Sequence, residues 1–455
     1  RVVYLKALHR AETGLANRLG ALMSVPVQST GMNGERISTE VLKKLAIQLS
    51  GEQLDVLEKI FSLRAVVITG GPGTGKTTLI RSITAVFEAI GKRVRLAAPT
   101  GRAARRLSEV TRRKASTIHR LLGYSYQEDR FDKNEYDPLD ADVIIVDETS
   151  MVDTLLMFHL IRAVSMTAVL VLVGDVFQLP PVGPGNVLSD MIDSKQIPVF
   201  YLKEIFRQAK ESPIVVNAHR VRHGKPPLPD ESALDRIDRP EALSEFYFIE
   251  QHDPKHMVET IAQLCSRTIP EYFGFSSMDD IQVLTPMHRG LVGDINLNQV
   301  LQSVLNPDPI PVGTPGGTFK TNDKVMHLKN NYQKDVFNGD IGFILEIDRK
   351  NELITIDYYG RSVTYEFMDL DEISLAYAIS VHKSQGSEYP AVILPLSTQH
   401  YPLLQRNLLY TALTRGQKLV VLTGSKRALA IALGNDKPGN RLSGLTARLR
   451  DCLPG

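Results

Sequence analysis

Residues 65–80 read AVVITGGPGTGKTTLI, and this segment is the most informative part of the sequence. Its first six residues are apolar and β-branched and end in glycine, which predicts a short buried strand. The pattern Gly70-x-x-x-x-Gly75-Lys76-Thr77 comes next, and an apolar-periodic helix then extends to about Ile90. A strand, a glycine-rich loop and a helix in this order are the context that a phosphate-binding loop requires.

The chemistry of the loop points to a nucleoside triphosphate. Glycines let the backbone wrap closely around an anion, and the helix N-terminus adds its positive dipole end. We expect Lys76 to reach the β- and γ-phosphates and the Thr77 hydroxyl to bind Mg²⁺. A glycine-rich turn without a ligand is the competing interpretation, and the correct flanks weigh against it. The residues expected around the phosphates are Gly71, Gly73, Thr74, Gly75, Lys76, Thr77 and Thr78.

Composition limits the class of protein. A chain of 455 residues suggests about three domains, and its 43% apolar content supports packed cores. The net charge is only +2, so a nucleic-acid surface has to be a local feature. Two cysteines cannot form a disulfide framework, which favours a reducing, cytoplasmic location. No apolar run approaches the roughly 18–20 residues that cross a membrane, so no membrane partner is expected.

The first 50 residues are mostly helical in pattern, and the chain opens on Arg1 inside such a pattern. We expect residues 1–50 to be the helical remnant of an N-terminal domain with a linker around 28–36. A preceding N-terminal part would be a place for a protein partner. The chain itself is expected to be a monomer.

Strands and helices alternate from residue 51 onward, and the strands are apolar throughout. This pattern predicts an α/β fold with doubly wound parallel sheets. The first lobe covers 51–208, with five expected strands at 65–70, 93–99, 142–148, 168–175 and 199–202. The second lobe covers 209–312 and 373–455, with strands at 246–250 and 281–286, in AYAISV and AVILPL, and at 418–424, and helices near 212–223, 256–273, 293–305 and 403–415.

Two insertions interrupt these lobes. Residues 313–372 are rich in short β patterns and turns, and Asn338-Gly339 before alternating apolar residues is a hairpin signal, so we expect a small barrel. Residues 124–138, YSYQEDRFDKNEYDP, have a polar turn between two arms that contain aromatic residues. They are either a surface loop or a protruding hairpin that acts as a wedge against a duplex.

Polar side chains follow two of the first-lobe strands. Asp147 and Glu148 end one strand, at the sheet edge where ligands bind, so one is suited to hold Mg²⁺ through water and the other to position the attacking water. A helix cap is the alternative for such an acidic pair. Gln178, in GDVFQLPPVGPG, is expected near the γ-phosphate; a proline-stiffened turn is its alternative.

These motifs, together with LKEIFRQ (202–208), VHKSQGSEYP (381–390) and LLYTALTRGQ (408–417), resemble the superfamily 1 helicases, most closely the RecD-like branch. The resemblance covers roughly residues 50–430 and implies two RecA-like lobes with ATP between them, single-stranded DNA across their tops and an SH3-like insertion. It implies nucleotide-site roles for Gln53 (adenine), Lys76 and Thr77 (phosphate and metal), Asp147 (metal), Glu148 (base), Gln178 (γ-phosphate), Arg207 and Arg415 (arginine fingers), Glu388 (ribose side) and Gly386 (ATP binding).

The same resemblance implies the DNA contacts. They fall in APTGRAA and STIHRLL in the first lobe and in TPMHRG and HKSQG in the second. For the arginines of residues 102–106, a solvated helix face is the alternative. The expected DNA-binding residues are Pro99, Thr100, Arg102, Thr117, His119, Pro286, His288, Arg289, His382, Ser384 and Gln385.

The expected activity is therefore an ATP-dependent DNA helicase acting on single strands and on junctions of single and double strands. Movement in the 5′→3′ direction is implied by the resemblance alone. An RNA helicase or a translocase that does not unwind is the first alternative. A nucleotide-switched scaffold that binds nucleic acid is the second.

Overall fold

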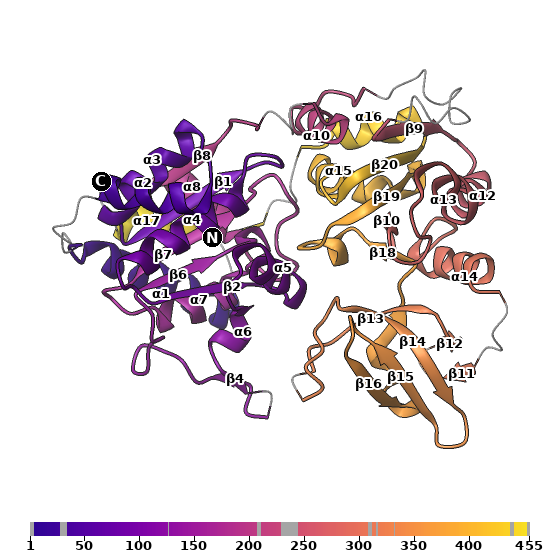
Figure 1. Ribbon diagram of the computed structural model, residues 1–455, viewed down its shortest axis with the longest axis horizontal. Coiled ribbons are helices and arrows are strands. Elements are labelled where there is room, and N and C mark those ends of the chain that lie inside the picture. Colours follow the sequence, from indigo (N-terminus) through magenta and orange to yellow (C-terminus); the bar gives the residue numbers. More distant parts are fainter. Residues whose placement is uncertain are drawn as a thin grey trace. The chain divides into compact units, whose positions relative to one another are not determined.

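The computed structural model describes residues 4–27, 34–125, 127–206, 211–228, 244–307, 312–314, 317–331, 333–436 and 441–452. The chain divides into two compact units. Unit 1 comprises Arg1–Lys210 and Pro438–Gly455, and unit 2 comprises Glu211–Lys437. Each unit contains its own parallel sheet, and the elements of both are labelled in Figure 1.

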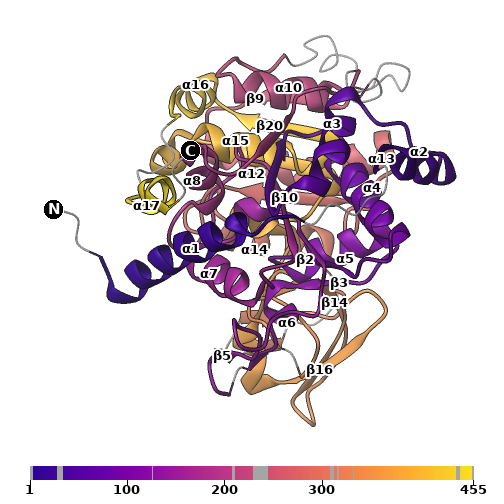
Figure 2. The same cartoon turned by 90° about the vertical axis from the view of Figure 1, so that its left-hand side faces the viewer.

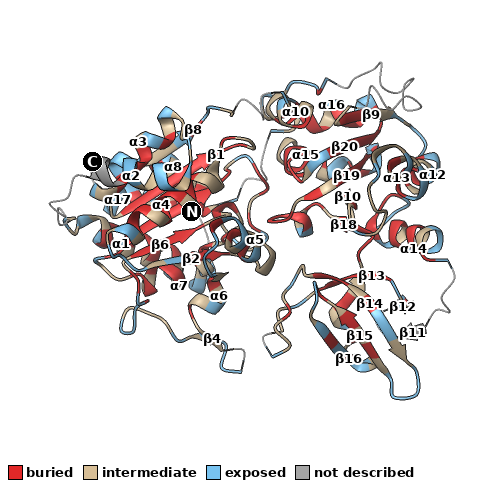
Figure 3. Ribbon diagram, viewed as in Figure 1, coloured by how far each residue is buried: buried red, intermediate tan, exposed pale blue. Residues whose placement is uncertain are grey.

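Six parallel strands form the sheet of unit 1. Its central strands β1 and β7 are buried at every residue because helices cover both faces (Figure 3). The sequence predicted five of the six strands and missed β3, which is only three residues long. In spatial order the strands are β3 (Ala115–Thr117), β2 (Val94–Ala98), β6 (Val143–Val146), β7 (Val169–Gly174), β1 (Ala65–Gly70) and β8 (Val199–Leu202).

The two faces of this sheet contribute to separate hydrophobic cores. Val67 packs in one core, and its neighbours Val66 and Ile68 pack in the other, as strand alternation requires. The helices of the lobe are α3 (Gly51–Lys59), α4 (Lys76–Ala89), α5 (Gly101–Thr111), α6 (Ile118–Leu121), α7 (Thr154–Ala163) and α8 (Val187–Ser194), with 3₁₀ turns η1 (Ile60–Ser62) and η2 (Thr149–Met151).

Both ends of the chain are part of unit 1. Helix α1 (Lys6–Ser24) packs along α7 and against α17 (Leu445–Cys452), and Leu15 and Leu19 are fully buried in the lobe's core (Figure 2). Helix α2 (Gly34–Leu45) packs on α4. This corrects two expectations: α1 is an integral part of the lobe, and α17 lies with unit 1 although the sequence analysis assigned 373–455 to the second lobe. Residues 28–33 of the expected linker lie outside the described residues.

The sheet of unit 2 has five parallel strands: β18 (Ala378–Ser380), β10 (Ile281–Thr285), β19 (Tyr389–Leu396), β20 (Gly416–Gly424) and β9 (Phe246–Glu250). The expected helix over 256–273 consists of α12, a π-helical turn and α13. The helices and turns are α10 (Pro213–Arg222), α12 (Pro254–Gln263), η4 (Leu264–Thr268), α13 (Ile269–Phe273), α14 (Asp294–Leu305), η6 (His382–Ser384), η7 (Thr398–Leu403), α15 (Arg406–Leu413) and α16 (Lys426–Gly434).

An inserted β-domain, residues 317–375, interrupts unit 2 after α14. Its five-stranded antiparallel sheet extends three residues past the expected end at 372, because β17 pairs with β13. The Asn338-Gly339 pair belongs to a long connection between β13 and β14 and does not form a two-residue hairpin turn. The elements are β16 (Ser362–Glu366), β15 (Leu353–Asp357), β14 (Ile341–Asp348), β13 (Lys324–His327), β17 (Ile373–Leu375) and η5 (Phe367–Glu372), with the hairpin β11 (Val312–Thr314) and β12 (Gly317–Phe319) beside them.

A buried carboxylate joins the inserted β-domain to its lobe. Asp323 is fully buried and accepts hydrogen bonds from Gln302 at 2.6 Å, Asn306 at 2.8 Å and the Tyr377 hydroxyl at 2.8 Å. Beside it, the Lys324 ammonium donates to the Ile281 carbonyl at 3.0 Å. Buried charges are tolerated when they are satisfied in this way, and the contacts fix the domain on α14 and β10.

Candidate nucleotide and nucleic-acid sites

The phosphate-binding loop has the conformation that its glycines predict. Gly73 and Gly75 have φ of +74° and +73°, and a Cβ on Gly75 would meet the Gln53 amide and the Phe206 ring, both at 2.6 Å. The first described intrahelical bond of α4 joins the Leu79 N–H to the Gly75 carbonyl. The preceding N–H groups of the first turn are therefore available to an anion.

Lys76 begins α4 and lies over the loop. Its ammonium donates to the carbonyl oxygens of Gly70 at 2.6 Å and Gly71 at 3.0 Å. The Thr74 hydroxyl closes the loop by donating to the Gly71 carbonyl at 2.9 Å. A positive charge thus sits above a ring of backbone groups, at the C-terminal edge of a parallel sheet.

Asp147 and Glu148 extend from β6 at that same edge. The Asp147 N–H continues the ladder to the Ala97 carbonyl, and one carboxylate oxygen accepts from the Glu148 N–H at 2.8 Å. Burial and the Glu148 charge raise the pKa of Asp147 to about 6, against the lowering effect of Lys76 and Arg106. Lys76 and Asp147 therefore act on one another electrostatically, and Arg106 joins them although the sequence analysis did not single it out.

The backbone at Glu148 is strained. Its φ of +52° is left-handed, which is unusual for a residue with a Cβ and costs on the order of 1–3 kcal/mol. Such strain is maintained where surrounding structure holds it, often at functional sites. This left-handed residue ends the strand direction immediately after Asp147.

Gln178 lies in the loop after β7, held by its N–H to the Asp175 carbonyl at 3.1 Å. The side chain is 7% exposed, and its Oε1 has no hydrogen-bond partner among the described residues. An unpaired buried amide oxygen costs about 1–3 kcal/mol, so a bound donor such as a positioned water fits here. Asp175, which the sequence analysis passed over, also accepts from the Phe177 N–H at 3.1 Å and shapes this turn.

Gln53 braces the loop from α3. Its Nε2 donates to the carbonyls of Thr74 at 3.0 Å and Gly75 at 3.2 Å, and its Oε1 accepts from the Ser50 N–H in a capping box. The residue is fully buried. The predicted role in reading adenine would require these bonds to open, and what the structure shows is a support for the loop.

A second segment meets the loop after β8. The Phe206 N–H donates to the Gly73 carbonyl at 3.1 Å, and Glu52 accepts from the N–H groups of Lys203 and Glu204. Arg207 follows Phe206 in the chain but lies outside the described residues. Its role as an arginine finger stays a prediction.

In unit 2, Arg415 is a buried cation at the end of α15. Its guanidinium donates to the Thr411 carbonyl, the Ser387 carbonyl and the Thr414 hydroxyl, each at 3.1 Å, and it is only 3% exposed. Among the described residues, no carboxylate lies within ion-pair distance of this guanidinium. Glu388 lies one residue beyond Ser387 and accepts from Gln417 at 3.1 Å; nearby Gly386 takes a φ of +72°.

The expected DNA contacts of unit 1 divide into two groups. Thr100 and Thr117 cap α5 and α6, at the ends of the neighbouring parallel strands β2 and β3, with Pro99 and Arg102 on either side of Thr100. His119 instead packs between Tyr124 and Phe131 at ring distances of 5.5 and 5.7 Å, and burial lowers its pKa. His119 thus supports the segment that follows it.

The first part of that segment is a short hairpin, and its action as a wedge against a duplex stays a prediction. Strands β4 (Tyr124–Ser125) and β5 (Arg130–Phe131) pair antiparallel, and His159 stacks on Phe131 from α7 at 4.6 Å. Residue 126 lies outside the described part. An aromatic base thus fixes a short polar turn that projects from the lobe.

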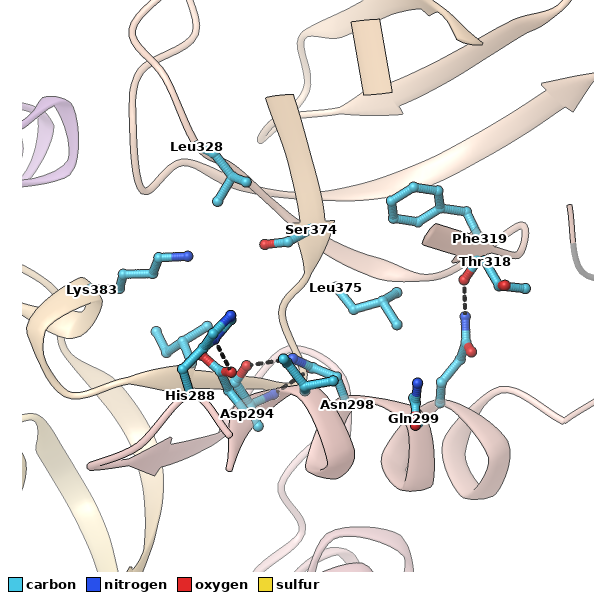
Figure 4. Close-up of a pocket in the computed structure, with 14 residues that line it drawn as sticks. His288, Asp294, Asn298, Gln299, Thr318, Phe319, Leu328, Ser374, Leu375 and Lys383 are labelled. Atoms are coloured by element: carbon cyan, nitrogen blue, oxygen red, sulfur yellow. Dashed lines mark hydrogen bonds and ion pairs between the residues drawn. The ribbon is translucent and has the colours of Figure 1, made fainter. Parts of the chain in front are cut away.

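One of the second-lobe candidates, His288, lines a pocket of about 420 Å³ between the sheet edge and the inserted β-domain (Figure 4). His288 Nδ1 lies 2.5 Å from the Asp294 carboxylate, and Lys383 reaches into the pocket from η6. Ser384 is fully buried, and its hydroxyl donates to the Val381 carbonyl. The remaining candidates, Pro286, Arg289, His382, Ser384 and Gln385, are not among the residues that line the pocket, and Gln385 is only 4% exposed.

The two other charged residues that line the pocket, Asp294 and Lys383, were missed by the sequence analysis. Asp294 starts α14 next to Gly293, which by itself indicates only a helix start, and Lys383 lies inside the HKSQG motif between residues that were chosen. Burial raises the pKa of Asp294, with His288 opposing the effect. The contact with Asp294 engages Nδ1 and thereby fixes the orientation of the His288 ring.

Comparisons with known proteins agree with this architecture. Residues 48–246 match the AAA domain family, 297–358 the SH3 domain of ATP-dependent RecD-like DNA helicases, and 375–423 the UvrD-like helicase C-terminal domain. The chain is 30% identical over 434 residues to the RecBCD enzyme subunit RecD of Mycobacterium tuberculosis, covering 88% of this chain and 73% of that protein. The chain belongs to the RecD-like helicase family.

A second RecD-like relative is the ATP-dependent RecD2 DNA helicase of Deinococcus radiodurans, 37% identical over 448 residues. That match covers 98% of this chain, which spans 58% of the Deinococcus protein. Among solved structures, Pif1 helicase from Bacteroides in complex with ADP-AlF3 and ssDNA aligns with a TM-score of 0.46 and 21% identity, covering 83% of this chain and 92% of that one. The inserted β-domain of this RecD-like chain is thus the SH3 domain of its family, and each parallel sheet belongs to a RecA-like lobe.

In the part of this RecD-like chain that the structure describes, no group of three or more histidine, cysteine or acidic side chains is arranged to hold a metal ion. No helix there combines the length and the apolar character needed to cross a bilayer.

Proposed function

We propose that this chain is an ATP-dependent motor that moves along single-stranded DNA and separates the duplex ahead of it. The main support for this proposal is the site at the C-terminal edge of the sheet in unit 1. The phosphate-binding loop carries Lys76 there, the Asp147 carboxylate interacts electrostatically with Lys76, and the loop after the neighbouring strand β7 carries Gln178 with its unpaired oxygen. Membership in the RecD-like family supports ATP as the nucleotide and DNA as the track.

The residues present suit a triphosphate bound with Mg²⁺. The Thr77 hydroxyl and, through water, Asp147 would hold the ion, which supplies charge neutralisation when bound. When the triphosphate binds, the Lys76 ammonium would give up its hydrogen bonds to the Gly70 and Gly71 carbonyls and would contact the phosphates instead. Glu148 would accept a proton from the attacking water, and Gln178 Oε1 would accept a hydrogen bond from that water and orient it.

Arg415 is the proposed contribution of unit 2 to the same triphosphate, together with Glu388 on the ribose side. Among the described residues, this buried guanidinium donates only to neutral oxygens and has no carboxylate to offset its charge, which suits it to receive an anion. Contacts made only while ATP is bound would favour a closed form of the two lobes. A shift from 1:99 to 99:1 needs about 5.5 kcal/mol, within reach of several charge-assisted bonds.

The DNA track is proposed to run over the helix starts at Thr100 and Thr117 and over the pocket at His288 and Lys383. The hairpin of residues 124–131 is proposed as the wedge that parts the strands. We also propose a monomeric, cytoplasmic protein that travels 5′→3′, as the family resemblance implies.

Strand-displacement assays on duplexes with a single tail test the proposal. We expect ATP-dependent unwinding of a DNA duplex with a 5′ tail and little unwinding with a 3′ tail. If the chain unwound RNA duplexes but not DNA duplexes, its substrate would be RNA and not DNA. ATP turnover that ignores single strands would favour a nucleotide-switched scaffold and contradict the motor.

A further inference from the structure

The last described segment of the chain crosses the loop that carries Gln178. We call residues 441–452 the C-terminal strap and residues 175–186 the sensor loop. The Arg441 guanidinium donates through Nη1 to the carbonyl oxygens of Gly183 and of Gly185, the latter at 2.9 Å. The strap therefore holds the second half of the loop whose first half presents Gln178.

The strap is itself firmly seated on unit 1. The Ser443 hydroxyl donates to the Asp190 carboxylate at 2.8 Å, the Thr446 hydroxyl donates to it at 3.0 Å, and the Gly444 N–H donates to Glu12 at 3.1 Å. Its apolar side chains Leu445 and Leu449 are fully buried in the lobe's core. The segment that carries Arg441 is thus anchored on unit 1, so Arg441 can restrain the sensor loop.

The two ends of the sensor loop are mechanically coupled, because the backbone between them has few free torsions. Leu179 is buried, and the two prolines that follow fix their own φ angles, which leaves few free torsions between Gln178 and Gly183. Gly185 has a φ of +89°. The Pro184 carbonyl between the two glycines accepts from the Thr154 N–H at 3.0 Å, so three successive carbonyls are engaged.

We propose that Arg441 is a positioning residue for Gln178, setting the sensor loop from its far end. The assignment rests on the proposed function, because Gln178 matters only if ATP is hydrolysed here. Charge-assisted hydrogen bonds from a guanidinium to two carbonyls are stronger and more directional than neutral ones, which suits a group that has to hold a loop at one setting. The strap thereby adds a part to the nucleotide site that none of the motifs contains.

The matched control lies on the same strap. Arg450 donates to the Asp193 carbonyl at 2.6 Å at the end of α8 and does not touch the sensor loop. Arg441→Ala should lower kcat for ATP hydrolysis about tenfold with little change in KM, whereas Arg450→Ala should leave both unchanged. Arg441→Lys, which keeps a charged donor, should recover part of the loss.

A double-mutant cycle separates positioning from general support. If Arg441 acts through Gln178, then adding Arg441→Ala to Gln178→Ala should cost little beyond Gln178→Ala alone. Fully multiplicative losses, or equal losses in Arg441→Ala and Arg450→Ala, would overturn the assignment.

A fluorescence reporter tests the hold without relying on activity. The chain has no tryptophan, and Val182 is 82% exposed beside Gly183, so Val182→Trp places one probe on the loop. Arg441→Ala should lower the probe's anisotropy, and Arg450→Ala should not; equal anisotropy in all three proteins would overturn the inference. Absence of ATPase in the unaltered chain would instead refute the proposed function, and the reporter would still decide whether Arg441 holds the loop.

Discussion

Gln53 and Thr74 are joined by a hydrogen bond of 3.0 Å from the Gln53 Nε2 to the Thr74 carbonyl oxygen. The same amide bonds to Gly75 and to Ser50, so its two donors and its oxygen are used by the protein itself. Helix α3 and the phosphate-binding loop are thereby fastened to one another. This arrangement supports the shape of the loop, whereas the family resemblance implied that Gln53 reads the adenine base.

Gln53→Ala therefore separates two roles. If Gln53 only supports the phosphate-binding loop, its loss should raise KM for ATP and for GTP by the same factor, about tenfold, because the loop contacts the phosphates of both nucleotides. Steady-state kinetics with each nucleotide measure this. A loss confined to ATP would show that Gln53 recognises adenine, and Glu58→Ala, at the far end of the same helix, serves as a control.

Arg415→Ala should slow ATP hydrolysis by about 10³-fold if the guanidinium stabilises the transferring phosphoryl group. ATP binding, measured separately with a fluorescent analogue, should weaken much less. Because Arg415 also bonds to Ser387 and Thr411, a melting curve has to accompany the kinetics.

Arg406→Ala is a suitable control, since Arg406 bonds within the same lobe to the Leu433 carbonyl and to Asp436. Near-normal turnover by a folded Arg415→Ala protein would remove Arg415 from the nucleotide site. Equal loss in both variants would indicate damage to the fold of the lobe.

Shortening the hairpin should uncouple ATP use from strand separation. Replacing residues 125–130 with two glycines keeps the aromatic base of Tyr124 and Phe131 on His119. We expect DNA-dependent ATPase to persist and unwinding to be lost.

A variant of unchanged length, with glycines at 127–129, controls for side-chain chemistry and should retain most unwinding if the wedge acts by its size. Full unwinding by the shortened protein would exclude a wedge at this position.

The stability of unit 2 should depend on pH through His400. Burial lowers the pKa of this histidine from its usual 6.5 to about 4, while its Nδ1 accepts from the Ser397 N–H. Between these values the unfolded chain binds more protons than the folded one, so stability falls as pH drops from about 6.5 to about 4. The full effect is on the order of 3 kcal/mol.

Urea unfolding between pH 7 and 4.5 measures this slope. His400→Asn, which keeps an acceptor for Ser397, should reduce the slope without abolishing it, because burial also lowers the pKa of His327 in the same unit to about 4; His252→Asn at an exposed site should leave the slope unchanged. An unchanged slope in His400→Asn would assign the acid sensitivity to another group.

The sequence predicted what is encoded locally. The strand, loop and helix at 65–90, the strand ends carrying Asp147 and Gln178, and the alternation of both lobes follow from short-range periodicity, and the structure has them. Strand β3 was missed because three residues carry no period, and its place is set by pairing with β2. The direction in which each side chain of a motif points also depends on the rest of the fold. In HKSQG, Lys383 lines the pocket whereas Ser384 is buried.

Contacts between segments that are far apart in the chain could not be predicted from sequence patterns. Nothing in the sequence of α17 indicates that it packs on α1, more than 400 residues away in the chain, because an amphipathic helix does not specify its partner. The same holds for the Arg441 contact with Gly185 and for the Asp323 joint, each of which depends on residues far apart in sequence.

The most direct test is the rate of ATP hydrolysis as single-stranded DNA is added to the unaltered chain, to Lys76→Ala and to Glu148→Gln. We predict a rate in the unaltered chain that rises with DNA and saturates, no turnover in Lys76→Ala, and retained ATP binding without turnover in Glu148→Gln. A rate indifferent to DNA, or equal rates in the unaltered chain and in Lys76→Ala, would contradict a motor driven from this site.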